Sequence, residues 1–192
     1  MTSDSGERRM PWGLWYRPPE ATEWDLTPRP ASASAITLSE QIELTGANLL
    51  GNVHGGTVMK LCDTAGGLAA MKHCGGPVVT VSMDEMVFLV PVRVGDLVHA
   101  HAQVNWTGRT SMEVGVRVSA ERWDEAGVPQ TRVATAYLVF VATVSEGKPR
   151  PVPPVVPESD RDRRRWNEAE IRRRHRLARR EAILASREKP LD

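Results

Sequence analysis

Asp63 is the residue of this sequence whose surroundings most favour chemistry. It is the single acid in residues 51–74, a stretch that begins as a loop rich in Gly, Asn and His and continues as a helical pattern. The apolar positions recur at three- and four-residue steps, which predicts a helix buried on most sides; they are Val58, Leu61, Cys62, Ala65, Leu68, Ala69 and Met71. A lone buried carboxylate is costly unless it is paired, hydrogen-bonded or used in catalysis. Asp63 is therefore the candidate general base.

The loop before this helix carries groups that suit a reaction at an acyl carbonyl. Backbone N–H groups in the first turn of a helix lack intrahelical partners, and the positive end of the helix dipole favours a developing oxyanion. Gly55 and Gly56 let a substrate carbonyl approach this backbone because neither carries a Cβ. Asn52 and His54 add side-chain donors. With Asp63 they supply a base, an oxyanion hole and a polarising group, which predicts attack of water on an acyl group.

The distance between these groups predicts active sites shared between subunits. Asp63 lies eight residues after Gly55, which is about 12 Å along a helix axis at 1.5 Å per residue. One chain therefore cannot easily bring its own Asp63 to its own loop at residues 52–56. Two such helices packed antiparallel across a two-fold axis can do so. We expect composite active sites at a dimer interface, one per protomer.

The elements that must position these residues follow from the pattern of the remaining chain. Strand-like runs occur once before the helix, at residues 35–44, and four times after it, at 78–89, 97–106, 111–123 and 131–144. The apolar residues of the 78–89 run share one face; they are Val79, Val81, Met83, Val87 and Leu89. Gly75 and Gly76 end the helix, and Pro77 prevents its continuation. One helix wrapped by about five antiparallel strands is an α+β architecture.

Length and composition indicate one globular domain with tails. The 192 residues are 41% hydrophobic and 26% charged. The sequence contains no run of about 18 apolar residues, so we expect no membrane span. The first ten residues lack a secretory signal, and the two cysteines lie too far apart on one helix to pair, so we expect a cytoplasmic protein. We divide the chain into an extended N-terminal arm (1–34), a domain (35–147), a proline-rich extended segment (148–158) and a basic C-terminal helix (159–192).

Three features of the sequence have both a functional and a structural interpretation, and in each case we favour the structural interpretation. Residues 160–189 carry twelve Arg or Lys against six Asp or Glu, but the acids are interspersed, so we expect a solvated helix and no nucleic-acid partner. His99 and His101 share a strand face without a further ligand at suitable spacing, so we expect no metal. Cys62 is next to Asp63, but its position fits the core and no base for a nucleophilic thiol is implied.

Several separated motifs resemble the hotdog-fold acyl-CoA thioesterases, both the bacterial single-hotdog type and the cytosolic two-domain acyl-CoA hydrolases of animals. The motifs are N-x-H-G-G-x-x-M-K-L-x-D at 52–63, AGGLAAMKHC at 65–74, F-L-x-P-V-x-x-G-D at 88–96, S-M-E-V at 111–114, E-G-K-P-R-P-V-P at 146–153 and V-P-E-S-D-R-D-R-R-R-W at 156–166. The resemblance covers residues 35–180 and does not cover the first thirty. It implies the hotdog fold, in which an antiparallel sheet wraps one central helix.

The resemblance also implies an activity, hydrolysis of fatty acyl-CoA to a free fatty acid and CoA, with no separate cofactor. In this family an Asp at the position of Asp63 acts as base or nucleophile, and an Asn at the position of Asn52 helps to hold substrate and water. The two-domain relatives divide these roles between domains, whereas this chain has both residues. Each site of a homo-oligomer is then complete. The family commonly forms trimers of hotdog dimers, which implies a homohexamer.

The remaining expectations concern substrate contacts. CoA phosphates need cationic partners, and the acyl chain is expected along the apolar side of the central helix. The implied substrate-binding residues are Met59, Arg109, Thr110, Ser111, Lys148 and Arg150. Two other functions stay open. A hotdog enoyl-CoA hydratase would need an Asp–His pair, and His54 lies far from Asp63 in one chain. A non-catalytic acyl-CoA sensor that contacts DNA would need a helix-turn-helix, and the sequence contains none.

Overall fold

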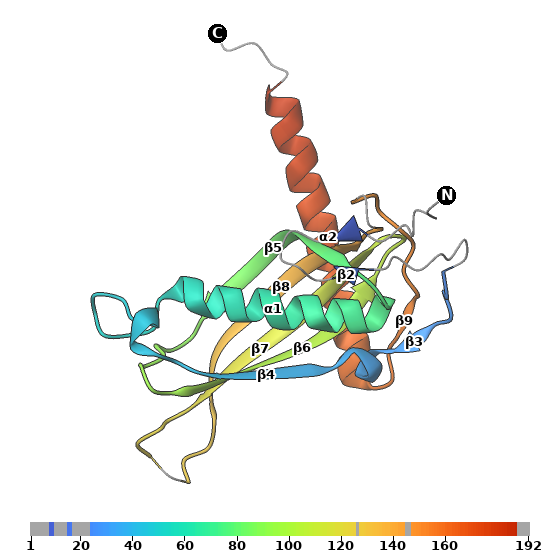
Figure 1. The fold of residues 1–192 in the computed structure, drawn as a ribbon. Helices are drawn as coiled ribbons and strands as arrows, with labels where there is room; N and C mark the ends of the chain where they lie inside the picture. Colours follow the sequence, from blue (N-terminus) through green and yellow to red (C-terminus); the bar gives the residue numbers. More distant parts are fainter. Residues whose placement is uncertain (1–7, 10–14, 17–23, 126, 145–146, 188–192) are drawn as a thin grey trace.

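An antiparallel sheet of five strands packed against one long helix forms the body of the molecule (Figure 1). The computed structural model describes residues 8–9, 15–16, 24–125, 127–144 and 147–187. The sheet has the order β4 (Ile36–Gln41), β6 (Leu97–Thr107), β7 (Ser111–Glu121), β8 (Thr131–Ala142) and β5 (Val78–Phe88). Helix α1 (Gly55–Cys74) comes between β4 and β5 in the chain. The predicted α+β hotdog architecture, with its order of strand, helix and four strands, is confirmed.

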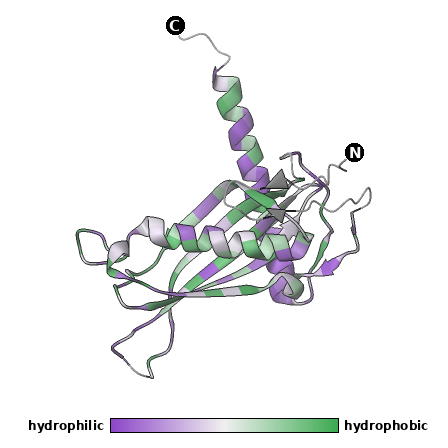
Figure 2. Cartoon of the chain, viewed as in Figure 1, coloured by the Kyte–Doolittle hydropathy of each residue, from purple (hydrophilic) through white to green (hydrophobic). Residues whose placement is uncertain are grey.

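Alternation of side chains explains why these runs form a half-buried sheet. In β6 and β7 the apolar side chains of one face are buried under α1, and polar side chains lie on the face away from α1, which we call the outer face. Figure 2 shows the same alternation of hydrophobic and hydrophilic residues along the strands. The centre of the core contains Met112, Leu138 and Phe140, all at most 1% exposed. The strand bounds differ from the predicted ones by three residues or fewer.

Helix α1 begins and ends at the residues that its sequence signals predict. His54 is the N-cap, and its side chain accepts a hydrogen bond from the Gly56 N–H. Gly75 takes the left-handed conformation, φ 72°, that favours glycine at a helix C-terminus. Gly66 lies over Phe140, where an added Cβ would stand 3.0 Å from the ring. The glycine therefore lets the helix pack closely on the sheet.

The predicted burial of Asp63 is wrong for the single chain, and an apolar surface of the sheet is uncovered as well. The Asp63 side chain is exposed, because α1 packs on the sheet by one side and Asp63 lies off that side. Most of the apolar face of β5 and the residue that follows the strand are also exposed: the exposed fraction is between 43% and 55% at Val79, Val81, Val87 and Leu89, whereas Met83 is partly buried against the core. The strand is at the edge of the sheet, pairs only with β8 in the described chain, and has two irregularities of register. An open edge with exposed apolar side chains is a surface suited to a second chain.

Helix α2 (Asp160–Arg187) crosses the outer face and then projects away from the body (Figure 1). Ion pairs attach it to the sheet, Arg172 with buried Glu113 at 2.6 Å and Arg176 with Asp84. The helix was predicted over 160–189; its end at 187 agrees, and residues 188–189 lie outside the described part. None of the described helices is long and apolar enough to cross a membrane.

The remaining elements are short, and they lie before β4, before α1 and in the proline-rich segment before α2. In the N-terminal region the structure has β1 (Arg8–Arg9), β2 (Trp15–Tyr16), β3 (Arg29–Pro30) and the 3₁₀ turn η1 (Ala31–Ser34). A second 3₁₀ turn, η2 (Leu44–Gly46), precedes α1, and β9 (Val155–Val156) pairs in parallel with β3. Most of the predicted N-terminal arm lies outside the described residues. The proline-rich segment contains β9 and is not wholly on the surface as predicted, because Val152 and Val155 are buried.

Candidate active site

A cleft of about 380 Å³ opens at the N-terminus of α1. Its walls come from the loop before α1, from the first turn of α1 and from the chain that leaves β5. The residues that line it are Asn48, Asn52, Val53, Gly55, Val58, Phe88, Leu89, Val90, Pro91 and Val92. The structure thus brings together two of the predicted site residues, Asn52 and Gly55, in a mostly apolar hollow that could hold a reacting group.

Asn48 organises the loop that precedes α1. Its carboxamide oxygen accepts hydrogen bonds from the backbone N–H of Leu50, at 2.8 Å, and of Asn52, at 3.2 Å. Its own backbone N–H donates to the Asn52 carbonyl at 2.7 Å. This arrangement is an Asx turn, which asparagine favours. The sequence interpretation missed Asn48, although an Asn four residues before Asn52 in a loop is the signal for such a turn.

The first turn of α1 holds the predicted oxyanion donors. Gly55 opens the helix, where backbone N–H groups have no intrahelical acceptor. An added Cβ at Gly55 would stand 3.4 Å from the Phe88 ring, so glycine keeps the approach open. The Gly56 N–H already donates to His54 Nδ1, at a long 3.3 Å. His54 therefore acts as a helix cap in this structure, and its predicted contact with the thioester stays a prediction.

Asp63 lies apart from that cleft and has a partner that the sequence interpretation missed. The Thr80 hydroxyl, on β5, donates to Asp63 Oδ1 at 2.7 Å. This bond orients the carboxylate across the gap between α1 and the edge strand. Because α1 is a continuous helix from Gly55 to Cys74, Asp63 is about 12 Å from the start of the helix, as predicted. In the single chain, the described residues that line the cleft do not include Asp63.

Cys62 and the pair His99 and His101, which we interpret as structural, have burial and hydrogen bonds that suit a structural role. Burial raises the pKa of the Cys62 thiol to about 12, so the reactive thiolate is scarce at neutral pH. His99 bonds to Ser39 and Glu121, and His101 bonds to Thr37 and Ser119, across strands of the outer face. In the part of the chain that the structure describes, no three His, Cys, Asp or Glu side chains form a group that could hold a metal ion.

Five of the six predicted substrate-binding residues lie in two adjoining segments, and the sixth, Met59, lies on α1. Arg109 and Thr110 lie in the turn between β6 and β7, and Ser111 begins β7. The carbonyl of Arg109 accepts from the Val152 N–H at 3.1 Å, which places this turn beside the segment that contains Lys148 and Arg150. The Arg109 and Lys148 side chains are exposed. Met59 is 41% exposed on α1.

Arg150 is the predicted phosphate ligand whose placement points to another role. It is 2% exposed, and its guanidinium donates to the Cys74 carbonyl, at 3.2 Å, and to the Cys74 sulfur. The same group lies over the Trp24 ring, 4.3 Å from its centroid. Carbonyls at a helix C-terminus lack intrahelical donors and carry a partial negative charge. Arg150 therefore stabilises the end of α1.

We expect Arg150→Ala to lower the free energy of unfolding by about 2 kcal/mol, because it removes a buried charge-assisted hydrogen bond. Chemical denaturation measures this change. Lys148→Ala is the matched control, since Lys148 is a neighbouring cation with an exposed side chain, and it should change stability little. Unchanged stability of Arg150→Ala with weaker substrate binding would contradict the structural role and support contact with CoA.

Comparisons with known proteins agree with the fold and with the motifs. The family model described as Thioesterase superfamily matches residues 50–125. The cytosolic acyl coenzyme A thioester hydrolase of Mus musculus is 35% identical over 150 residues, which are 77% of this chain and 39% of the mouse protein. This chain thus spans less than half the length of that relative. It is also similar to a solved hexameric acyl-CoA thioesterase, at 34% identity with a TM-score of 0.75 over 80% of this chain and 97% of the other.

A third similar protein gives information about single residues. The acyl-CoA hydrolase of Staphylococcus aureus, solved with butyryl coenzyme A and coenzyme A, is 35% identical, with a TM-score of 0.76 over 83% of this chain and 96% of that one. Its structure has also been solved with alanine in place of one Asn, one Asp and one Thr. The replaced Asp follows that Asn by 15 residues and precedes that Thr by 17. With these similarities and the observed fold, the chain belongs to the hotdog-fold acyl-CoA thioesterase family.

Proposed function

We propose that this chain is an acyl-CoA thioesterase that hydrolyses fatty acyl-CoA to a free fatty acid and CoA. One observation carries the proposal, a set of three residues. Asp63 accepts a hydrogen bond from Thr80, and Asn48 lies in the loop that precedes the helix of Asp63, α1. Asp63 follows Asn48 by 15 residues and precedes Thr80 by 17. These are the spacings of the three residues replaced in the Staphylococcus aureus acyl-CoA hydrolase. The same spacing supports a corresponding set of residues here.

The proposed reaction uses Asp63 as the general base. Its carboxylate takes a proton from a water molecule, whose oxygen attacks the thioester carbonyl. The N–H groups at the start of α1 stabilise the oxyanion that forms. When the intermediate collapses, the C–S bond breaks and CoA leaves as a thiolate, a good leaving group that needs no separate general acid. A route in which Asp63 attacks the carbonyl itself and water then hydrolyses the anhydride uses the same residues.

The geometry supports sites formed by two chains. Asp63 and Thr80 lie near the edge of the sheet, where β5 exposes apolar side chains and, among the described strands, pairs on one side only. If β5 of one chain pairs antiparallel with β5 of another, the two-fold axis also makes the α1 helices antiparallel. Asp63 of one protomer then faces the Asn48–Gly55 side of the partner's cleft. We propose this dimer as the catalytic unit, and three such dimers as a homohexamer like the solved hexameric relative.

The remaining parts of the proposal concern substrate contacts and location. The exposed cations Arg109 and Lys148 are proposed to contact the phosphates of CoA, with Thr110 and Ser111 beside them. Met59 is proposed to contact the acyl chain. The name of the mouse relative supports a cytosolic location.

Thiol release from a ladder of acyl-CoA substrates, from acetyl to palmitoyl, tests the proposed activity directly. We expect turnover of at least one chain length by the purified protein, with a chain-length preference that the ladder ranks. The hydratase alternative predicts hydration of an enoyl-CoA without thiol release. Binding of acyl-CoA without turnover of any substrate would support the sensor alternative and contradict the thioesterase.

Asn48→Ala and Asn52→Ala separate two candidates for the catalytic carboxamide. The spacing argument favours Asn48, whereas the sequence motif points to Asn52. We expect Asn48→Ala to lower kcat/KM by about 10²-fold, in the range found for loss of an active-site donor, and Asn52→Ala to have the smaller effect. Because Asn48 also shapes the loop, Asn48→Asp is a useful companion: it keeps the acceptor oxygen that binds Leu50 and Asn52 and removes the donor. Equal activity of Asn48→Asp and wild type would contradict a donor role.

A further inference from the structure

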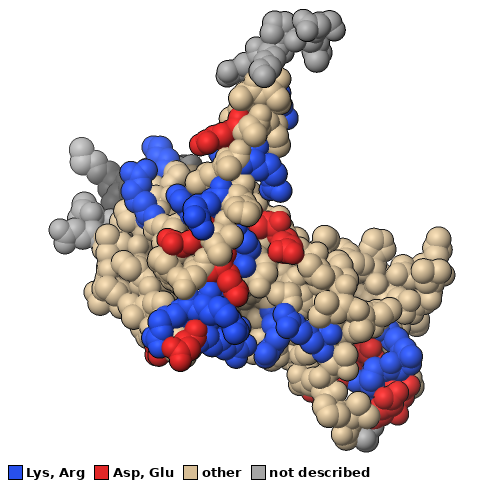
Figure 3. Space-filling model, turned by 180° about the vertical axis from the view of Figure 1, so that it is seen from behind, with Lys and Arg blue, Asp and Glu red and all other residues tan. Residues whose placement is uncertain are grey.

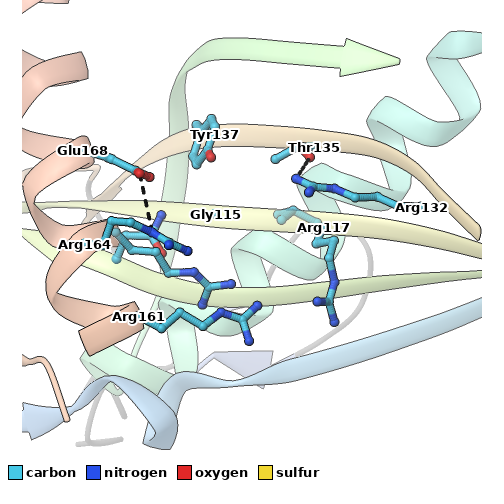
Figure 4. A pocket seen from close by; sticks show the side chains of 11 residues that line it. Gly115, Arg117, Arg132, Thr135, Tyr137, Arg161, Arg164 and Glu168 are labelled. Atoms are coloured by element: carbon cyan, nitrogen blue, oxygen red, sulfur yellow. Dashed lines mark hydrogen bonds and ion pairs between the residues drawn. The ribbon is translucent and has the colours of Figure 1, made fainter. Parts of the chain in front are cut away.

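The outer face of the sheet carries a second hollow, which we call the arginine pocket. It has a volume of about 370 Å³ and lies between the first turns of α2 and strands β7 and β8 (Figure 4). Its charged lining residues are Arg117, Arg132, Arg161, Arg164, Arg165 and Glu168. Gly115 forms part of the floor, where an added Cβ would stand 2.6 Å from the Asn105 side chain. The missing side chain at Gly115 leaves room for the Asn105 side chain, which also lines the hollow.

The charges in this pocket are poorly balanced. Glu168 is the single carboxylate in the lining, and it pairs with Arg164 at 3.7 Å. Within the described residues neither Arg117 nor Arg161 forms an ion pair. Burial, followed by the positive charge of Arg161 and, to a smaller extent, that of Arg117, lowers the pKa of Arg165. Figure 3 shows Lys and Arg gathered on this side of the molecule. Repulsion among these positive charges destabilises the folded protein, and an anion bound between them reduces that repulsion.

Several of these arginines are held in position. The Arg165 guanidinium donates to Gln103 Oε1 at 3.2 Å, and Gln103 in turn donates to Asp162 at 3.0 Å. Arg132 donates to the Thr135 hydroxyl at 2.6 Å, which leaves the Thr135 proton available to a ligand. Figure 4 shows Arg117 and Arg161 reaching toward each other from β7 and α2. The pocket therefore has donors held in place on two elements, α2 and β8, and a further guanidinium from β7.

We propose that the arginine pocket binds a small molecule with two adjacent phosphate groups, separately from the acyl-CoA site. Guanidinium groups bind phosphate oxygens in pairs, and a single monovalent anion would leave most of this charge unneutralised. The volume lies in the range of small-molecule sites. The catalytic residues are on the other side of the sheet, because Gly115 and Arg117 alternate with the buried Val114 and Val116 that face α1. The diphosphate can be inorganic or part of a nucleotide.

Calorimetric titration of the full chain with inorganic pyrophosphate, ADP and CoA tests this site. We expect pyrophosphate to bind, and its affinity to fall by about tenfold or more in the variant Arg117→Gln/Arg161→Gln, since each arginine contributes charge-assisted hydrogen bonds. The control Arg174→Gln/Arg180→Gln removes the same charge from exposed positions of α2 outside the pocket, and it should keep the affinity. Affinity should also fall with added salt. Tighter binding of ADP than of pyrophosphate would identify the nucleotide as the source of the diphosphate.

Three results would overturn the proposal. Wild type that does not bind pyrophosphate or ADP shows that no such site exists. Equal loss of affinity in the pocket variant and the control shows general charge attraction. A pocket variant whose KM for acyl-CoA rises in step with the loss of pyrophosphate binding shows that these arginines belong to the substrate site. The titrations contain no acyl-CoA, so their outcome is independent of whether the chain is a thioesterase.

Discussion

Replacement of Asp63 by Ala is expected to lower kcat/KM for acyl-CoA by about 10²–10⁴-fold, the usual contribution of a general base. A nucleophilic role would give a loss at least as large. The protein should stay folded, because the Asp63 side chain is exposed. Among the described side chains, only Thr80 donates a hydrogen bond to Asp63, so the substitution removes a single bond. Thiol release at saturating and limiting substrate measures the loss, and circular dichroism with size-exclusion chromatography checks the fold and the assembly.

Substitution of Thr80 provides the matched control for this result. Thr80→Val keeps the shape of the side chain but cannot donate to Asp63, so we expect a loss of about tenfold, smaller than for Asp63→Ala. Thr80→Ser keeps the hydroxyl and should restore most of the activity. Wild-type turnover by Asp63→Ala would exclude Asp63 as base and as nucleophile. Equal effects of Thr80→Val and Thr80→Ser would mean that packing at this position, and not the hydrogen bond, is what matters.

The fold was predictable because its signals are local. Alternation along β6, β7 and β8 reports a sheet with one covered face, and the residues around His54 and Gly75 report the two ends of α1. Each signal needs only neighbours in the chain. The strand ends therefore agree within three residues of the predicted ones, although strand pairing itself is long-range.

The exposure of Asp63 and of the apolar face of β5 in the single chain was not predictable in the same way. An apolar pattern reports that a surface is covered, but it does not say whether the same chain or another one covers it. The exposed Val79, Val81 and Val87 follow the predicted periodicity and lie on the open edge of the sheet. The pattern of the sequence thus fits the proposed dimer better than it fits one isolated chain.

Three side chains of functional interest were misread or missed because their partners are distant or irregular. Arg150 is buried against Cys74, 76 residues earlier in the chain, and arginine in a proline-rich segment normally indicates exposure. Thr80 meets Asp63 only when β5 lies beside α1. Asn48 acts through an Asx turn, which has no periodic signal. The spacing shared with a solved relative, rather than any repeat in the pattern, points to Asn48 and Thr80 together.

Mixed oligomers of two inactive variants are expected to regain activity if the active site is shared between chains. In a dimer of Asn48→Ala with Asp63→Ala, one site carries both substitutions and the other carries neither. Random pairing of equal amounts makes half of the dimers mixed, which would return about a quarter of wild-type activity. Dimers selected through both tags are all mixed and should return about half. The two variants are co-expressed with different affinity tags, purified through both tags and assayed by thiol release. Asn52→Ala replaces Asn48→Ala in this experiment if it is the more damaging of the two.

The pair Asp63→Ala with Thr80→Val is the decisive control. Asp63 and Thr80 are bonded within one chain, so each site of a mixed dimer takes both residues from the same protomer. One site then lacks the base and the other lacks its hydrogen-bond donor, and no intact site can form. Recovery with the Asn48 pair but not with the Thr80 pair places the loop and the carboxylate on different chains. Activity that never exceeds the sum of the two separate variants would instead mean that each chain forms its own site, which would require Asp63 to approach the loop by bending α1.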